Sequence, residues 1–229
     1  MLHMNLLAID TAAKLCAACV YDADAGRELG RSVRDIGKGH AEVLMDVIGE
    51  ALAKANLTFP DMNAIAVAVG PGSFTGIRVG VSVARGLALA LKIPATGITT
   101  LEALAFEARE NFGAKHMLAA IDGGRDGIYA AIYDEFGKID YAPAVVDLET
   151  VKEIARGAAV VTGSAARRVA EAAGLENLLI GSDAATADIA AYARLALANG
   201  LSNEKPRPLY LRAPDAKPQS HLSLPRKEG

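Results

Sequence analysis

Apolar and polar positions alternate along this chain with two periods, one typical of strands and one typical of helices. Residues 64–69 form an unbroken apolar run that ends at a Gly-Pro-Gly sequence, as expected for a buried strand followed by a tight turn. Ser73 or Thr75 can then cap a helix that begins near Gly76 and continues to Leu91. The pattern therefore predicts a strand, a glycine turn and a helix that packs closely against its neighbours.

Hydrophobic patterning continues in this way through both halves of the chain. In the first half it predicts helices at 41–56, 76–91 and 100–111 and strands at 64–69 and 94–98. In the second half it predicts helices at 149–156, 164–173 and 186–199 and strands at 158–162 and 178–180. Helices and strands that alternate at this spacing are typical of an α/β protein with mixed sheets flanked by helices.

Each half opens with the same pattern. The sequence Leu-Ala-Ile-Asp, which ends at Asp10, recurs as Ala-Ala-Ile-Asp ending at Asp122, at an offset of 112 residues. A second strand ending in Tyr-Asp follows each of them at the same offset, and a glycine turn comes next, at Gly26 or Gly137. The sequence therefore predicts an internal duplication and two similar lobes.

We expect the first lobe at 1–112, a smaller second lobe at 113–213, and an extended or disordered tail at 214–229. This plan resembles that of the actin-like ATPase superfamily, in which paired hairpins that carry Asp residues grip nucleotide phosphates from either side. The resemblance makes Asp10 and Asp122 candidates for a vestigial nucleotide site.

Two interpretations of these carboxylates stay open. In one, they contact a metal or a phosphate. In the other, each accepts hydrogen bonds from N–H groups of its own turn. The first turn, residues 11–14, lacks the glycines that let a backbone approach a phosphate closely. We therefore do not expect full ATPase competence.

The glycine segment at 70–80 also has two interpretations. Free N–H groups at a helix start attract anions, which would make this segment a phosphate cradle. However, its spacing fits neither a Walker loop nor a dinucleotide fingerprint. We favour the alternative that the glycines allow a sharp turn and close packing of backbone on backbone.

Composition narrows the function classes. The chain has 229 residues, a net charge of −3 and a pI of about 5.8, so nothing indicates autonomous binding to nucleic acid. The start lacks an export signal and no apolar run approaches the ~20 residues that cross a bilayer, so we expect a cytoplasmic protein without a membrane role. Cys16 and Cys19 lie three apart on a predicted strand, where their thiols face opposite sides and hold no metal.

The chain also lacks a recognisable catalytic constellation. Its four histidines form no close pair and no Gly-x-Ser-x-Gly elbow is present, so we expect no catalytic residue and no metal site. Helix 41–56 carries an apolar stripe, and helix 76–91 is apolar nearly all round with many small residues. Either these helices present a second face to a partner, or they only cover the sheet.

Several of these segments together resemble the TsaB (YeaZ) family. They include Gly-His-Ala-Glu-Val-Leu at 39–44, Gly-Pro-Gly-Ser-Phe-Thr-Gly-Ile-Arg at 70–78, Thr-Leu-Glu-Ala-Leu-Ala at 100–105 and Leu-Tyr-Leu-Arg at 209–212. The likeness covers most of the chain and is densest in residues 5–135. It implies an actin-like (ASKHA, ribonuclease H-like) duplicated fold with two lobes of mixed β-sheet.

The resemblance further implies a non-catalytic scaffold subunit. In this family the protein dimerises with a TsaD-type catalytic subunit, and a TsaE-type ATPase binds the pair. Together they transfer a threonylcarbamoyl group to the adenosine next to the anticodon of tRNA. ATP and metal are then expected on the partner subunits rather than on this chain, and tRNA only through the complex.

By the same resemblance, the first two helices of each subunit form the interface, and the isolated chain can form a homodimer through them. The implied interface residues are His40, Val43, Leu44, Val47, Ile48, Ala51, Arg78 and Ser82. The alternative function is an actin-like ATP-dependent enzyme that uses Asp10 and Asp122. A glycoprotease-like peptidase is a third alternative, for which the sequence supplies neither a metal pair nor a nucleophile–base set.

Overall fold

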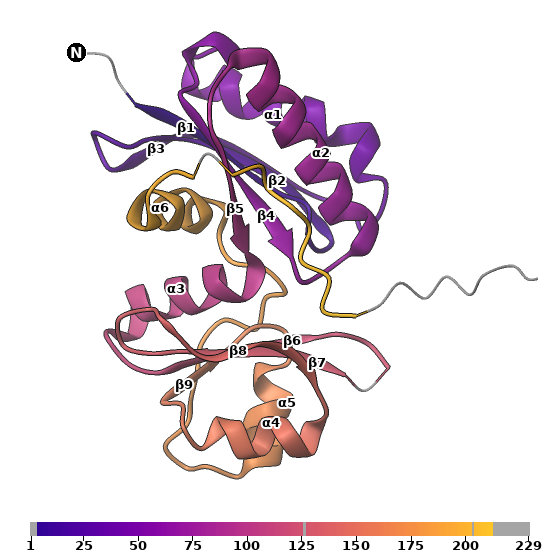
Figure 1. Ribbon diagram of the computed structural model, residues 1–229, viewed down its shortest axis with the longest axis vertical. Coiled ribbons are helices and arrows are strands. Elements are labelled where there is room, and N and C mark those ends of the chain that lie inside the picture. The colour runs from indigo at the N-terminus through magenta and orange to yellow at the C-terminus, as the bar shows by residue number, and fades with distance from the viewer. Residues whose placement is uncertain (1–3, 126, 203, 213–229) are drawn as a thin grey trace, which may run out of the picture.

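The structure, a computed structural model, describes residues 4–125, 127–202 and 204–212 (Figure 1). The expectation of an extended tail at 214–229 lies outside these residues. The first half contains β1 (Asn5–Asp10), β2 (Leu15–Asp22), β3 (Arg27–Asp35), α1 (His40–Ala55), η1 (Phe59–Asp61), β4 (Ala64–Gly70), α2 (Phe74–Leu91), β5 (Ala95–Thr99) and α3 (Thr100–Phe112). The second half contains β6 (Met117–Asp122), β7 (Ile128–Tyr133), β8 (Ile139–Val146), α4 (Leu148–Ala155), β9 (Val160–Thr162), α5 (Ala166–Ala173), β10 (Leu179–Ile180) and α6 (Ile189–Asn199).

The predicted duplication is confirmed by the topology of the two sheets. The first sheet has the strand order β3-β2-β1-β4-β5, and the second has the equivalent order β8-β7-β6-β9-β10. In both, a central strand that ends in Asp pairs antiparallel with the next strand and parallel with a later one. The strands and helices predicted from patterning are all present, with ends that differ by a few residues.

Two strands were missing from the sequence-based expectation, and both are edge strands. β3 reads Arg-Glu-Leu-Gly-Arg-Ser-Val-Arg-Asp, so its charged residues hide the alternation that marks a strand. β8 contains Pro143, which lacks the N–H needed inside a sheet but is tolerated at an edge. Charge and proline are common protections of exposed sheet edges, and they weaken the hydrophobic signal for the same reason.

The helices and sheets form layers (Figure 1). Helices α1 and α2 cover one face of the first sheet, and α6 covers the other. Helix α3 lies against α6 on one side and against the second sheet on the other, while α4 and α5 cover that sheet's far face. One apolar core therefore runs from α1 through the first sheet, α6 and α3 to β6, and a smaller core lies beneath α4 and α5.

This layering corrects the expected lobe boundary. The division at residues 112 and 113 assigned α6 to the second lobe, but α6 packs on β1, β2, β4 and β5. Its small apolar residues, among them Ala190, Ala193 and Ala196, are buried there. The segment after α6, residues 204–212, also returns to the first sheet, where the N–H of Leu209 donates to the carbonyl of Val69 at 2.8 Å. We call this segment the strap.

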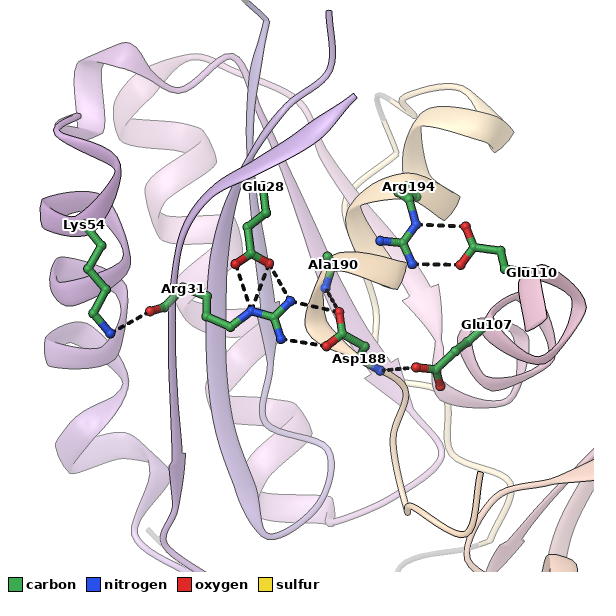
Figure 2. A network of polar contacts seen from close by, with 8 residues as sticks. All are labelled: Glu28, Arg31, Lys54, Glu107, Glu110, Asp188, Ala190 and Arg194. Carbon is green, nitrogen blue, oxygen red and sulfur yellow. Dashed lines mark hydrogen bonds and ion pairs between the residues drawn. The ribbon is translucent and has the colours of Figure 1, made fainter. Parts of the chain in front are cut away.

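Polar contacts hold the start of α6 in place (Figure 2). Arg31 of β3 donates to Glu28 and to the two carboxylate oxygens of Asp188, at 2.7 and 3.1 Å. Asp188 caps α6 by accepting the N–H of Ala190 at 2.9 Å, and its own N–H donates to Glu107 of α3 at 3.2 Å. The network thus joins the edge of the first sheet to both helices that lie between the lobes.

A second contact, between Arg194 of α6 and Glu110 of α3, is bidentate with bonds of 2.7 and 2.9 Å. Burial alone would raise the pKa of Asp188, but the hydrogen bonds from Arg31 and Ala190 hold it below its usual range. The groups are partly exposed, so each pair adds only modest stability. Their main effect is to fix the orientation of α6 and α3.

The start of α2 packs directly on the turn between β1 and β2. A β-carbon added at Gly76 would overlap the carbonyl oxygen of Thr11, and one added at Gly72 would overlap that of Ala12. Gly86 lies further along the same helix, and a β-carbon added there would have open space around it instead. The glycines at the start of α2 are therefore required by close approach, as favoured from the sequence.

We predict that Gly76→Ala lowers the free energy of unfolding by about 1–3 kcal/mol, because the added methyl group forces α2 away from the turn. Gly86→Ala is the matched control in the same helix. It should raise stability by roughly 0.5–1 kcal/mol, since alanine loses less backbone entropy than glycine. Urea unfolding of the isolated chain measures both. Equal effects of the two substitutions would contradict the proposed packing.

Candidate partner-binding face and inter-lobe pocket

Two of the N–H groups at the start of α2 are bonded within the protein. The N–H of Ser73 donates to the carbonyl of Ala12 at 2.6 Å, and that of Gly76 donates to the Ser73 hydroxyl at 3.2 Å. The hydroxyl of Thr11 in turn donates to the carbonyl of Gly76 at 2.7 Å. The first hairpin turn therefore packs directly against the start of α2, which supports the alternative that the glycines allow close packing of backbone on backbone.

Asp10 lies at the end of β1 and is buried. Its Oδ1 accepts the N–H of Ala12 at 2.8 Å, and its carboxylate is hydrogen-bonded to the side chain of Thr186 in the segment that enters α6. Burial raises the pKa of Asp10 to about 6, against the opposing effects of the Ala12 N–H, Thr186 and His40. The carboxylate thus ties the first turn to the segment that returns from the second lobe.

Asp122 lies at the equivalent end of β6 but is exposed. Its Oδ1 accepts the N–H of Gly124 at 2.9 Å. Asp10 makes the equivalent bond to the N–H of Ala12, which also lies two residues further along the chain. The structure places one of the two candidate nucleotide residues inside the core and the other at the surface. Each carboxylate bonds to its own turn, as the second interpretation from the sequence describes.

The apolar stripe of α1 faces the first sheet. Leu44, Val47, Ile48 and Ala51 are buried, and α1 packs on β2 and β3. A β-carbon added at Gly30 of β3 would overlap the backbone of α1, so helix and strand touch directly at that point. This corrects the expectation that these four side chains form a partner interface, because the sheet already covers them.

The other residues expected at the interface differ in exposure. His40 is buried, and its Nε2–H donates to the carbonyl of Leu15 at 3.1 Å. Val43 is half-buried, whereas Arg78 and Ser82 of α2 are exposed. Arg78 lies over the ring of Phe74 with its guanidinium carbon 5.0 Å from the ring centre. The structure therefore leaves α2, more than α1, available to a partner.

An apolar surface does run along the outer side of these two helices. Helix α2 buries the side that contains Gly76, Ile77, Gly80, Val81 and Ala84 and leaves the opposite side open. A shallow groove of about 440 Å³ lies between its first turns and Ala41 of α1. We define the α1–α2 face as Ala41, Met45, Phe74, Arg78, Val79, Ser82, Val83, Gly86 and Leu89.

Several members of this face are strongly exposed for apolar side chains. Leu89 is 82% exposed, Met45 47% and Phe74 45%. Among the described residues, α2 is the helix whose length and composition would suit a membrane span. Its apolar character has another explanation here, because one side packs on the sheet and the other forms the α1–α2 face.

A second hollow lies between the lobes, beneath the strap. It measures about 700 Å³ and extends from the start of α2 to the β6–β7 turn and to the end of the strap. Arg212 of the strap donates to the carbonyls of Gly123 and Gly124 at 3.0 and 3.1 Å and lies over the ring of Tyr129. We call this hollow the inter-lobe pocket. The sequence Leu-Tyr-Leu-Arg at 209–212 carries part of the family resemblance but gives no signal for a pocket.

Within the described ranges, no group of three or more His, Cys, Asp and Glu side chains is placed to hold a metal ion. Cys16 and Cys19 are both free and buried in β2, and burial raises the pKa of each thiol. Neither thiol is therefore suited to act as a thiolate ligand or nucleophile at neutral pH.

Comparison with known proteins agrees with this architecture. Residues 34–193 match the family described as TsaD, tRNA N6-adenosine threonylcarbamoyltransferase. The chain is 36% identical over 137 residues to the tRNA threonylcarbamoyladenosine biosynthesis protein TsaB of Escherichia coli (strain K12), a stretch that covers 58% of each chain. It is 32% identical over 215 residues to an uncharacterized protein of Mycobacterium tuberculosis, covering 93% of this chain and 94% of that protein.

Among solved structures, an uncharacterized protein from Pseudomonas aeruginosa with similarity to peptidase YeaZ superimposes with a TM-score of 0.76. It is 30% identical, and the match covers 91% of this chain and all of that one. The chain spans little more than half the length of the curated TsaB proteins that it matches. Its two equivalent sheets and Asp-ending hairpins define a duplicated fold of two mixed sheets flanked by helices. More particularly, the chain belongs to the TsaB/YeaZ family.

The buried carboxyl of Asp10 predicts a specific pH dependence. The folded chain keeps this proton up to about pH 6, whereas an unfolded Asp loses it near pH ~4, so folding favours the protonated form. The contribution of Asp10 to stability should therefore fall by roughly 3 kcal/mol as the pH rises from about 4 to about 7, and stay level above that.

In Asp10→Asn this decline should disappear, because no proton is lost. Urea unfolding at a series of pH values measures the difference between the two proteins. Asp122→Asn, at the equivalent but exposed position, serves as the control and should keep the wild-type profile. A profile of Asp10→Asn that runs parallel to the wild type would show that Asp10 is not the group responsible.

Proposed function

We propose that this chain is a non-catalytic scaffold subunit that dimerises with a TsaD-type catalytic subunit. With a TsaE-type ATPase, the pair would support threonylcarbamoyl transfer to the adenosine next to the anticodon of tRNA. The observation that carries the proposal is the α1–α2 face, an exposed apolar surface on an otherwise well-packed chain. Surfaces of this kind mark protein interaction sites in soluble proteins.

The composition of the face suits contact with other helices. Gly86 has open space around it, and Ser82 is small and exposed, so a partner helix can approach the α2 backbone closely. Leu89, Met45 and Phe74 supply apolar area, and Arg78 adds a charge near one end. Apolar and aromatic anchors with small neighbours are typical of a helix-to-helix interface.

The family relationships support the choice of partner. The chain matches the TsaD family over most of its length, and it resembles proteins named for tRNA threonylcarbamoyladenosine biosynthesis. Two related chains that share a fold present equivalent helices, which can pair about a pseudo-twofold axis. A second copy of this chain could pair through the same face when the partner is missing.

A non-catalytic role fits the state of the first hairpin turn. Ser73 and Gly76 use their N–H groups within the protein, and Asp10 is buried and bonded to Ala12 and Thr186. ATP and metal would then be held by the partner subunits. Among the described residues, no observation favours the alternative of an ATP-dependent enzyme or that of a peptidase.

Reconstituted transfer tests the function directly. We expect threonylcarbamoyl transfer to tRNA by the cognate TsaD-type and TsaE-type proteins to require this chain. The doubly substituted Asp10→Asn, Asp122→Asn chain should support transfer as well as the wild type does. Loss of transfer while the complex still forms would point to a nucleotide site in this chain. Transfer that proceeds equally well without the chain would refute the proposal.

The interface is tested by a charge placed on the α1–α2 face. Ser82→Arg should weaken binding of the TsaD-type subunit at least tenfold, about 1.4 kcal/mol, because the exposed hydroxyl is replaced by a bulky cation within the interface. Ala198→Arg on the exposed side of α6 is the matched control and should bind normally. Isothermal titration calorimetry measures both affinities, and equal affinities would move the interface elsewhere.

A further inference from the structure

The inter-lobe pocket is positively charged in a chain whose net charge is −3. Arg78, Arg125 and Arg212 contribute to its lining, and none of the described residues that line it is Asp or Glu. The three arginines come from α2, the β6–β7 turn and the strap, which are far apart in the sequence. The fold therefore gathers cations at this place against the overall charge of the protein, which favours an anionic ligand.

Aromatic rings lie among these cations. Phe74 and Tyr210 are each 45% exposed, with ring centres 5.1 Å apart and planes inclined by 34°. Arg78 lies over Phe74, and Arg212 lies over the third ring, Tyr129. Exposed rings held beside guanidinium groups offer a stacking surface to a flat ligand that also carries negative charge.

The pocket is built by contacts within the chain. Leu209 is bonded to Val69 of β4, and Arg212 is bonded to Gly123 and Gly124 across the gap between the lobes. The strap thus holds Tyr210 in position from both sides. A ligand would meet an arrangement that already exists, which lowers the entropic cost of binding.

A free nucleoside triphosphate fits this pocket poorly. The N–H groups of the three glycines in the β6–β7 turn are used within the turn: that of Gly123 donates to Gly127, that of Gly127 to Gly124, and that of Gly124 to Asp122. No backbone cradle for adjacent phosphates remains among them. Separate arginines around an open hollow suit phosphates spaced along a strand instead.

Charge also continues beyond the pocket. A groove of about 600 Å³ beside the first residues of the strap is lined by Lys205 and Arg207, together with one acidic residue, Glu204. In the other direction, Phe74 and Arg78 line both the inter-lobe pocket and the groove of the α1–α2 face. A strand in the pocket would therefore lead toward the surface proposed for the catalytic partner.

We infer that the inter-lobe pocket binds unpaired nucleotides of the RNA substrate, with bases stacked at Phe74 and Tyr210 and phosphates near the arginines. Unstacked bases of RNA loops are bound in this way by aromatic and arginine side chains. The inference rests on the proposed function, and it adds that this chain itself contacts the RNA rather than only supporting the partner.

The test uses the complete complex and a fluorescein-labelled anticodon stem–loop RNA, with binding followed by fluorescence anisotropy. Tyr210→Ala should weaken binding at least fivefold, since a stacked base contributes about 1–3 kcal/mol. Arg125→Gln should weaken binding and lower the slope of log affinity against log salt by about 0.7, as expected for one lost phosphate contact with a single strand.

Two controls match these changes outside the pocket. Phe136→Ala removes another exposed ring, and Arg156→Gln removes another exposed arginine. Both should bind the RNA as the wild type does. A fully paired duplex of the same length should bind equally to all variants, because it offers no unstacked base.

The outcomes separate this inference from the proposed function. Failure of the wild-type chain to pair with the catalytic subunit would refute the function itself. Normal pairing and transfer, with pocket variants that bind the stem–loop like the controls, would overturn only the RNA site. Loss of ATP binding in the pocket variants without any change in RNA binding would likewise overturn it and assign the pocket to a mononucleotide.

Discussion

The contact between the start of α2 and the β1–β2 turn determines much of what this molecule can do. Glycines at 72 and 76 bring the helix backbone onto Thr11 and Ala12, and the N–H groups of Ser73 and Gly76 bond within the chain. In an actin-like fold this turn is where a nucleotide phosphate would be expected. Here the helix seals it, so the same interaction that orders the first lobe also removes the room for a ligand.

That contact also fixes which side of α2 meets solvent. Because Gly76 and Gly80 must face the turn, the residues on the opposite side of the helix face outward. Apart from Arg78 and Arg85 they are apolar or small, which a helix that merely covered a sheet would not require. Helix α1 differs, since its apolar stripe is buried against β2 and β3. The two helices are neighbours, but α2 contributes most of the open surface.

The sequence predicted the duplication, the central strands and most helices because those elements have strong periodic patterns. It did not predict β3 or β8, where charge and Pro143 mask edge strands. It also misplaced α6, since packing on the first sheet depends on contacts with residues more than a hundred positions away. The interface residues on α1 were misjudged for a related reason: a stripe at helical spacing shows that a face is buried, but not whether a sheet or a partner buries it.

The two halves of the duplication have diverged in complementary ways. The first turn is closed by α2, and its Asp10 is buried. The second turn keeps its glycines and an exposed Asp122, and it is held by Arg212 from the strap. The first lobe carries an outward apolar face, while the second lobe and the strap line a cationic pocket. Because α2 borders both surfaces, a partner on one and an RNA strand in the other would meet at Phe74 and Arg78. A single helix, oriented by its glycines, thereby joins the protein-binding and RNA-binding surfaces that we propose.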